Sequence, residues 1–180
     1  MGLSLGAVAA TDFVLAHPER VNKLILAAPG LIGYDLNHDS VLVANDRKLD
    51  AARQRHDTLA YAEYFLRSWT DGPKRKPASV DPKVRAFVMG MVRDNLKQHQ
   101  WATHLEFTYE PPANQRLNTI KASTLVLVGD LDMADILTIS DELAQKIPTV
   151  KKVVIPNAAH MLNLEQPALF NRHVRQFLLN

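Results

Sequence analysis

A serine between two glycines stands near the start of the chain and is the first candidate nucleophile. Residues 2–6 read Gly-Leu-Ser-Leu-Gly, and a small, apolar, helix-compatible run follows from Ala7 to Ala10. This pattern is typical of a serine on a sharp strand-to-helix turn, with its Oγ exposed. Glycines two residues before and after the serine predict close backbone approach on both sides of the turn. The first N–H groups of the helix would face the negative charge that develops when Ser4 attacks a carbonyl group.

Candidate acid and base residues come much later in the chain. Asp130, Asp132 and Asp135 follow one strand-like stretch, and His160 follows the next. In parallel α/β sheets, functional groups lie in loops at the carboxyl ends of the strands. The order serine, aspartate, histidine is one of three known orders of a serine hydrolase triad. Of the three aspartates, Asp132 is the predicted triad acid, whereas Asp130 and Asp135 are expected to cap loops or face solvent.

The elements that would position these residues alternate between helix and strand. A helix is predicted over 7–16, and strands over 21–28, 123–129 and 152–156, with helices after the last two. The stretch from about 40 to 115 instead carries apolar residues at helical spacing. This order predicts an α/β fold with about three parallel strands, flanking helices and a helical cap.

The predicted division follows from the same pattern. Residues 1–34 and 118–180 would form the α/β core, and residues 35–117 the cap. Large side chains in the cap are candidates to line a substrate pocket, although packing between cap helices is the favoured interpretation for each of them. The pocket candidates are Trp69, Met89, Met91, Trp101 and Phe107.

Composition excludes several classes of function. The formal net charge is +2, and the only tight basic cluster, Lys74-Arg75-Lys76, lies between prolines and is expected in a solvated loop, so nucleic-acid binding is not predicted. No apolar run has the ~18 residues of a membrane span, and no membrane association is expected. There is no cysteine and no pair of histidines with zinc-site spacing, so no metal and no cofactor is predicted. We expect a cytoplasmic protein whose partner is a small-molecule substrate.

Three motifs together resemble a known family. Gly2 to Gly6, the stretch Leu125-Val126-Leu127-Val128-Gly129-Asp130-Leu131-Asp132, and the stretch from Asn157 to Pro167 are similar to the nucleophile elbow, acid loop and histidine loop of α/β-hydrolase-fold serine hydrolases. The resemblance is strongest to bacterial esterases, lactonases and carbon–carbon hydrolases. It implies that Ser4 is the nucleophile, His160 the general base and Asp132 the residue that orients His160. It also implies that the backbone N–H of Leu5 gives half of the oxyanion hole.

One departure from the family pattern leaves two hypotheses for the function of the chain. The family's first strands, and the loop that gives the second oxyanion donor, precede the elbow, whereas only Met1 precedes it here. The chain therefore resembles the C-terminal two-thirds of the fold, and we expect the strand at 21–28 to have an exposed edge through which it self-associates. Two hypotheses remain. The first is a serine hydrolase of carboxylic esters, lactones or related carbonyl compounds; the second is a truncated, non-catalytic protein that acts by binding or needs a complementing segment.

Overall fold

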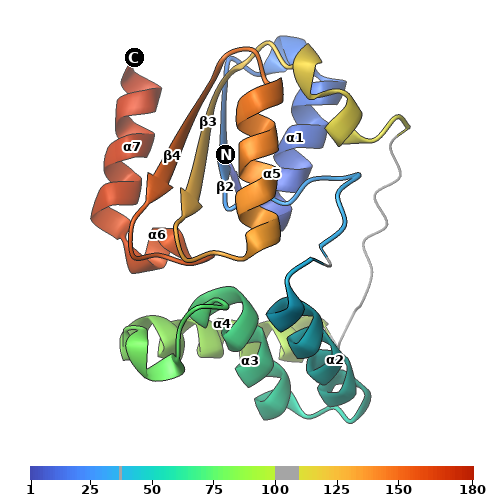
Figure 1. The fold of residues 1–180 in the computed structure, drawn as a ribbon, viewed down its shortest axis with the longest axis vertical. Helices are drawn as coiled ribbons and strands as arrows, with labels where there is room; N and C mark the ends of the chain where they lie inside the picture. The colour runs from blue at the N-terminus through green and yellow to red at the C-terminus, as the bar shows by residue number, and fades with distance from the viewer. Residues whose placement is uncertain (37, 100–109) are drawn as a thin grey trace.

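The computed structural model describes residues 1–36, 38–99 and 110–180 and consists of an α/β core and a helical cap (Figure 1). The strands of the core are β1 (Gly2–Leu3), β2 (Lys23–Ala27), β3 (Ser123–Gly129) and β4 (Val150–Ile155). The helices are α1 (Leu5–Ala16), α2 (Ser40–Gln54), α3 (Thr58–Leu66), α4 (Pro82–His99), α5 (Ala134–Lys146), α6 (Leu162–Glu165) and α7 (Pro167–Leu179).

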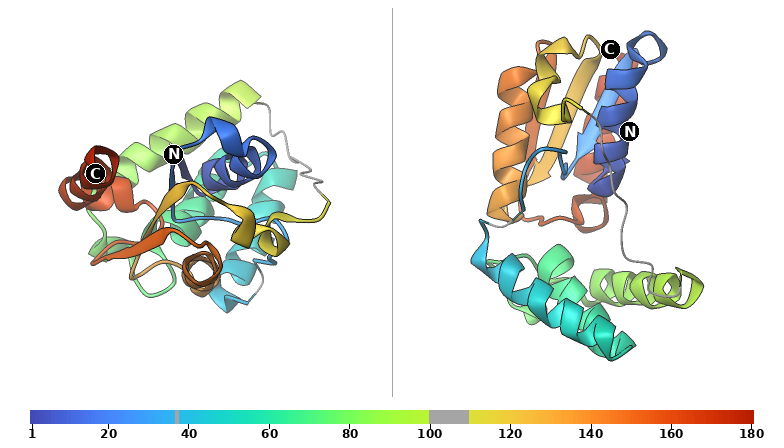
Figure 2. Two further views of the ribbon diagram at one scale, coloured as in Figure 1. Left: turned by 90° about the horizontal axis from the view of Figure 1, so that it is seen from above. Right: turned by 90° about the vertical axis from the view of Figure 1, so that its right-hand side faces the viewer.

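All four described strands are parallel and lie in the order β1-β2-β3-β4. The connections from β1 to β2 and from β3 to β4 each contain one helix, and right-handed crossovers in a sheet of sequential order place α1 and α5 on the same face. Figure 2 shows these two helices on one side of the sheet and α7 on the other. Lys23 fixes α7 there, because its Nζ donates to the carbonyls of Phe177 and Leu178 at the C-terminal end of that helix.

The predicted α/β fold is confirmed, and the sheet has one strand more than the three that the sequence indicated. Strand β3 has the predicted bounds, while β1 is a two-residue strand that pairs with Leu26 and Ala27 of β2. The backbone of Leu24 to Leu26 was expected to be left unpaired at the edge of the sheet, but Leu26 is paired with Gly2. The part of β2 that precedes Leu26 has no strand beside it on that side among the described residues.

The cap lies across the carboxyl ends of the strands, where the arrowheads in Figure 1 point. Its helices α2, α3 and α4 lie between β2 and β3 in the chain. The short 3₁₀ turns Ala113–Gln115 and Leu117–Thr119 follow, and Ala113 and Leu117 belong to the hydrophobic cluster of the core, although they fall within the stretch assigned to the cap from the sequence.

The chain passes from the core into the cap at a junction made by Asp39 and Asp135. Asp39 begins α2 by accepting hydrogen bonds from the N–H groups of Val41 and Leu42. Asp135, at the start of α5, accepts from the N–H groups of His38 and Asp39 and from Nδ1 of His38 at 2.9 Å. Asp135 was expected to cap a loop or face solvent. It is buried, and its carboxylate caps the backbone at the point where the chain passes from core to cap.

None of the helices that the structure describes is both long enough and apolar enough to cross a membrane.

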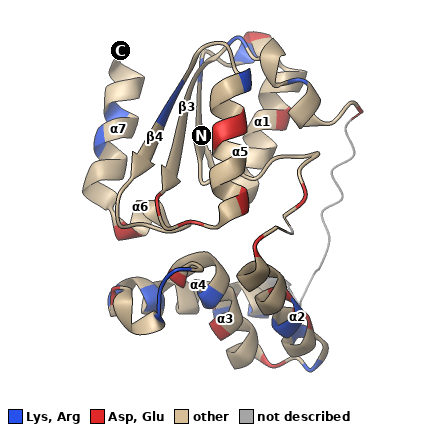
Figure 3. Ribbon diagram, in the orientation of Figure 1, with Lys and Arg blue, Asp and Glu red and all other residues tan. Residues whose placement is uncertain are grey.

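Acidic residues are concentrated at the end of the core that faces the cap, as the red segments in Figure 3 show, and several basic residues lie opposite them in the cap. Charged residues of both signs are therefore present where the loops after the parallel strands face the cap.

Candidate active site

Ser4 lies at the turn between β1 and α1, in a backbone conformation that few residues adopt. Its φ is 53° and its ψ is −116°, which is a strained combination for a residue with a side chain. The turn is fixed on both sides, because Ser4 N–H donates to the carbonyl of Ala27 in β2 and the Ser4 carbonyl accepts from Ala7 and Val8 in α1. Backbone strain of this kind is concentrated at functional sites, which makes Ser4 a candidate for such a role.

The two glycines around Ser4 differ in what they do. A Cβ on Gly2 would collide with the carbonyl group of Gly6, so only glycine fits at that position. A Cβ on Gly6 would contact nothing within 4 Å among the described residues. The expected close approach is therefore present before the serine, while the described structure gives no steric reason for the glycine after it.

Leu5 is the first residue of α1, and its backbone N–H is one of those that a helix leaves without an intrahelical acceptor. It sits at the positive end of the helix dipole, directly after Ser4. This is the position from which an N–H can donate to an oxyanion that forms at a carbonyl attacked by the serine.

Asp132 and His160 come together as a buried pair. Asp132 lies in the loop after β3 and His160 in the loop after β4, and each residue is 1% exposed. Nδ1 of His160 is 3.2 Å from both carboxylate oxygens of Asp132. Because a carboxylate accepts hydrogen bonds, a neutral imidazole in this contact carries its proton on Nδ1 and keeps Nε2 as an acceptor, which is the tautomer a general base needs.

Backbone N–H groups hold the carboxylates of the acid loop in place. Asp132 Oδ1 also accepts from the N–H of Met133 at 2.8 Å, and Asp130 Oδ1 accepts from the N–H of Ala158 in the histidine loop at 3.3 Å. Gly129, at the end of β3, allows the two loops to approach, since a Cβ there would collide with the Ala158 carbonyl oxygen. Asp130 thus joins the two loops, which is the loop-capping role expected for it.

Nε2 of His160 is buried and makes no hydrogen bond to any described residue, Ser4 included. The ring of Trp69, from the cap, packs against the imidazole with 4.6 Å between ring centroids. A buried nitrogen that lacks a partner is rare in a native structure and calls for a functional explanation. An acceptor nitrogen kept without a partner is available to take a proton.

A cavity of about 520 Å³ lies between the cap and two core segments, the one that precedes Ser4 and the one that follows His160. Leu3, directly before Ser4, and Met161, directly after His160, are part of its wall. The other described residues that line it are Tyr61, Phe65, Phe87, Val88, Met91, Val92, Asn95, Leu96, Asn163 and Leu164. The wall is mostly apolar and, among the described residues, contains no lysine, arginine, histidine, aspartate or glutamate.

The residues predicted for the pocket are distributed differently. Met89 lines a second cavity, of about 460 Å³, formed by α4 together with Leu66 and the segment around Pro77. Trp69 packs on His160 and against the core cluster. Neither is among the described residues of the larger cavity, whereas Met91, also a candidate, is part of its wall. Trp101 and Phe107 lie outside the described residues.

Sequence reasoning missed two residues next to the site, Arg75 and Glu165. Arg75 was expected in a solvated loop, but its side chain is only 12% exposed and forms an ion pair with Glu165, which is 5% exposed. The signal that could have identified Glu165 is its place five residues after His160, within the histidine motif. No signal in the sequence distinguishes Arg75 from the lysines on either side of it.

Comparison with known proteins agrees with this geometry. A family profile described as the alpha/beta hydrolase fold matches residues 1–167. The chain belongs to this family. Its curated relatives include a 2-hydroxy-6-oxo-6-phenylhexa-2,4-dienoate hydrolase of Burkholderia cepacia, 28% identical over all of this chain, and carboxylesterase YbfK of Bacillus subtilis, 27% identical over 98% of it. The chain spans 62% and 56% of the lengths of these two proteins.

Among solved structures, this alpha/beta hydrolase fold protein is similar to a thermophilic esterase from Thermogutta terrifontis. The TM-score is 0.75 at 24% identity, and the match covers 98% of this chain and 62% of the esterase. At that identity the likeness shows the shared fold. Within the described residues, no group of three or more histidines, aspartates and glutamates is arranged so that it could hold a metal ion.

Proposed function

We propose that this chain carries the catalytic machinery of a serine hydrolase that acts on neutral carboxylic esters. The observation that carries the proposal is the buried Asp132–His160 pair, which leaves Nε2 of His160 as an unpartnered acceptor among the described residues. Ser4, in its strained turn, is the only serine of the sequence with the elbow pattern. Ser4, Asp132 and His160 each follow a strand of one sheet, in the order that the alpha/beta hydrolase fold uses.

In the proposed reaction, Ser4 Oγ attacks the ester carbonyl carbon while Nε2 of His160 takes its proton. The Leu5 N–H donates to the oxyanion, and Asp132 stabilises the imidazolium. Collapse of the tetrahedral intermediate breaks the bond to the alkoxy group, which takes the proton from His160 and leaves as an alcohol. Water then hydrolyses the acyl-enzyme by the same steps. The hydrogen bond from Ser4 to Nε2, which this structure does not contain, is expected to form in the reacting complex, as is common for catalytic contacts.

The lining of the large cavity favours neutral esters over acid anions. The names of several relatives specify anionic substrates, among them a dienoate and a nonadienedioate. Binding a carboxylate in a mostly apolar cavity requires a cationic or multiply donating partner, because an unpaired buried charge is strongly disfavoured. The described wall offers no cation, and its polar side chains are Tyr61, Asn95 and Asn163. An ester with an apolar acyl chain suits this wall better.

Covalent labelling tests the assignment of the nucleophile. A fluorophosphonate should react with Ser4 alone, as located by peptide mass mapping, and the Ser4→Ala variant should remain unlabelled. Labelling at another serine, or equal labelling of the variant, would rule out Ser4. A wild-type protein that folds but is never labelled would favour the non-catalytic alternative.

The substrate class is tested by a matched pair of p-nitrophenyl esters, the butyrate and the hemisuccinate, which differ in the charge at the end of the acyl chain. The butyrate should have a kcat/KM at least about tenfold higher, because burying the carboxylate without a cation costs more than about 1.4 kcal/mol. Equal values for the two esters would exclude an apolar acyl site.

A further inference from the structure

One segment of the cap, residues 67–76, contacts both loops of the catalytic pair, and we call it the cap strap. It begins as a single π-helical turn, Arg67–Asp71, at the end of α3. The Trp69 ring packs on His160. Gly72, at a φ of 75°, passes so close that a Cβ there would lie 2.7 Å from the Leu131 carbonyl oxygen and 3.0 Å from Cβ of Ala159. The strap therefore lies directly against the acid loop and the histidine loop.

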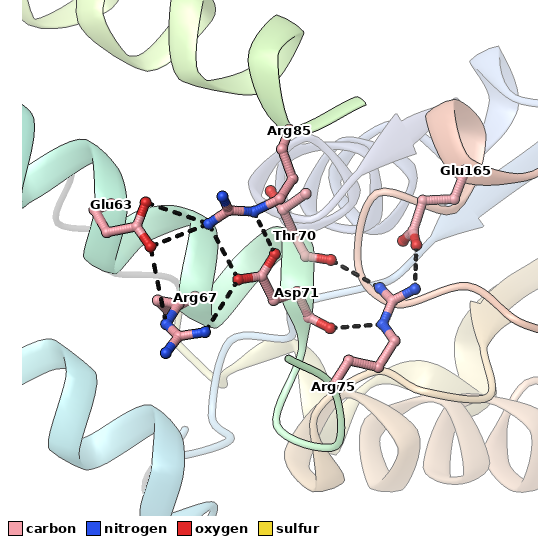
Figure 4. Close-up of polar contacts among 7 residues, drawn as sticks. All are labelled: Glu63, Arg67, Thr70, Asp71, Arg75, Arg85 and Glu165. Atoms are coloured by element: carbon pink, nitrogen blue, oxygen red, sulfur yellow. Dashed lines mark hydrogen bonds and ion pairs between the residues drawn. The ribbon is translucent and has the colours of Figure 1, made fainter. Parts of the chain in front are cut away.

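Arg75 holds the strap in this position with all three of its guanidinium nitrogens (Figure 4). Nε donates to the Asp71 carbonyl at 2.7 Å and Nη2 to the Thr70 carbonyl at 2.9 Å, which satisfies the end of the π-helical turn. Nη1 is 2.6 Å from Oε2 of Glu165 in the core. A planar guanidinium fixed at three points has little freedom to move.

Glu165 passes this restraint to the catalytic histidine. Its second oxygen, Oε1, accepts from the backbone N–H of Ala159 at 2.8 Å. Ala159 directly precedes His160, so the same carboxylate binds a cap arginine and the peptide that carries the general base. A hydrogen bond to a nearly buried carboxylate is charge-assisted and stronger than one between neutral groups.

The other side of the strap is fixed within the cap. The buried carboxylate of Asp71 accepts a hydrogen bond from Nε of Arg85 at 2.8 Å. Nη2 of Arg85 also donates to Glu63 of α3 at 3.1 Å. Burial opposes the charge of Arg85, but the hydrogen bonds and negative charges of Asp71 and Glu63 outweigh it and raise the pKa of Arg85. The Glu63–Asp71–Arg85 cluster thus makes the strap a rigid part of the cap, and Arg75 is the charged link from there to the core.

We propose that Arg75 is a positioning residue for His160 and acts through Glu165 and the Ala159 N–H. The position of the cap relative to the core would then determine where the imidazole of His160 lies. This inference rests on the proposed hydrolase function. Nδ1 of His160 already lies at the long limit of hydrogen bonding to Asp132, and small displacements of a catalytic group of about 1 Å are enough to reduce rates by about 100-fold.

Two conservative variants separate positioning from folding. Arg75→Lys keeps a positive charge near Glu165 but loses the three-point geometry, and Glu165→Gln keeps an acceptor for Ala159 N–H but loses the ion pair. The matched control is Arg67→Ala, an arginine of the same strap whose ion pairs, at 3.7 Å to Asp71 and 3.9 Å to Glu63, stay within the cap. Melting temperatures of the wild type, these three variants and the Arg75→Lys/Glu165→Gln double variant show whether each protein is folded.

The first measurement is the rate at which a fluorophosphonate labels Ser4 as its concentration is raised. We expect Arg75→Lys and Glu165→Gln to lower the maximal labelling rate about 10–100-fold while the half-saturating concentration stays the same. The double variant should label no more slowly than either single variant, because the two residues act through one contact. Arg67→Ala should label at the wild-type rate.

The second measurement, amide hydrogen exchange at Ala159 by NMR, does not depend on catalysis. Exchange at Ala159 should become faster in both variants and remain unchanged in Arg67→Ala. Wild-type labelling rates in Arg75→Lys and Glu165→Gln would overturn the inference, even if exchange at Ala159 increased. Slow labelling of Arg67→Ala as well would overturn it too, because general loosening of the cap would then explain the loss. If the wild type is never labelled at Ser4, the proposed function itself fails, and the exchange data then report only a structural contact.

Discussion

At the scale of single residues, the three aspartates around the acid loop have different tasks. Among them, only Asp132 contacts the imidazole of His160. Asp130 joins the two catalytic loops and Asp135 fixes the entrance to the cap. A substitution that removes charge but keeps shape should therefore affect chemistry at one position and stability at another.

We expect Asp132→Asn to lower kcat for p-nitrophenyl butyrate by about 10⁴-fold without a large loss of stability, because the amide disturbs the tautomer of His160. Asp135→Asn should instead lower the midpoint of urea unfolding, because its buried carboxylate accepts from His38 and Asp39. Parallel measurements of kcat and unfolding on both variants check this. If Asp135→Asn inactivated the enzyme and Asp132→Asn did not, the assignment of the triad acid would be wrong.

At the scale of elements, helix α1 contains a buried aspartate with an unsatisfied carboxylate oxygen among the described residues. Asp12 is buried in α1, and its Oδ2 has no hydrogen-bond partner among the described residues. Burial raises the pKa of Asp12 above its ordinary value of 3.8, and the charge of Arg116 lowers it in part. The folded protein therefore holds this proton more tightly than the unfolded chain does. The contribution of Asp12 to stability is then favourable below the unfolded pKa and is lost as the pH rises through the folded one.

An Asp12→Asn variant should gain stability relative to the wild type as the pH rises from about 4 to 7, because the amide has no charge to desolvate. Urea unfolding at several pH values, followed by circular dichroism, gives the difference. Asp94→Asn, at an exposed position of α4, is the control and should show no comparable trend. A difference between Asp12→Asn and wild type that stays constant with pH would show that desolvation of the Asp12 charge is not the cause.

The elements themselves were largely predictable, and the contacts between distant elements were not. Strand β3 was readable because its run of mostly apolar and β-branched residues suits a strand covered on both faces. The loops that carry Asp132 and His160 followed from their places after strands. Strand β1 was missed, because two residues carry no periodicity. Arg75 was misjudged, because its burial depends on Glu165, which is 90 residues away in the chain and has no local signature near Arg75.

At the scale of the whole molecule, only part of β2 is paired with a strand on its β1 side. Strand β1 pairs only with Leu26 and Ala27, so the backbone of Lys23 to Ile25 on that side has no neighbouring strand among the described residues. Met1 and Leu5, which flank β1, are exposed apolar residues. An uncovered edge of this kind favours pairing between chains.

We therefore expect a polypeptide of residues 1–180 by itself to associate and to hydrolyse esters slowly. Only one oxyanion donor, the Leu5 N–H, is proposed among its described residues, and loss of a single donor costs roughly 10²–10³ in kcat. Size-exclusion chromatography and p-nitrophenyl butyrate hydrolysis measure both properties, alone and with the segment that precedes the elbow in its longer relatives supplied in cis or in trans. A monodisperse monomer whose rate does not increase with that segment would refute this expectation.

The place where the cap leaves and rejoins the core has an evolutionary consequence. β2 and β3 are neighbours in register, with Lys23 opposite Ser123, so the whole cap is one excursion between two adjacent strands. Such an excursion can lengthen, shorten or be exchanged between relatives while strand pairing stays the same, and substrate preference can then be inherited separately from the catalytic residues. The link from Arg75 to Glu165 restricts that freedom. A cap transplanted onto this core would have to bring its own cation to Glu165, so this pair is a compatibility requirement for chimeras built on this core.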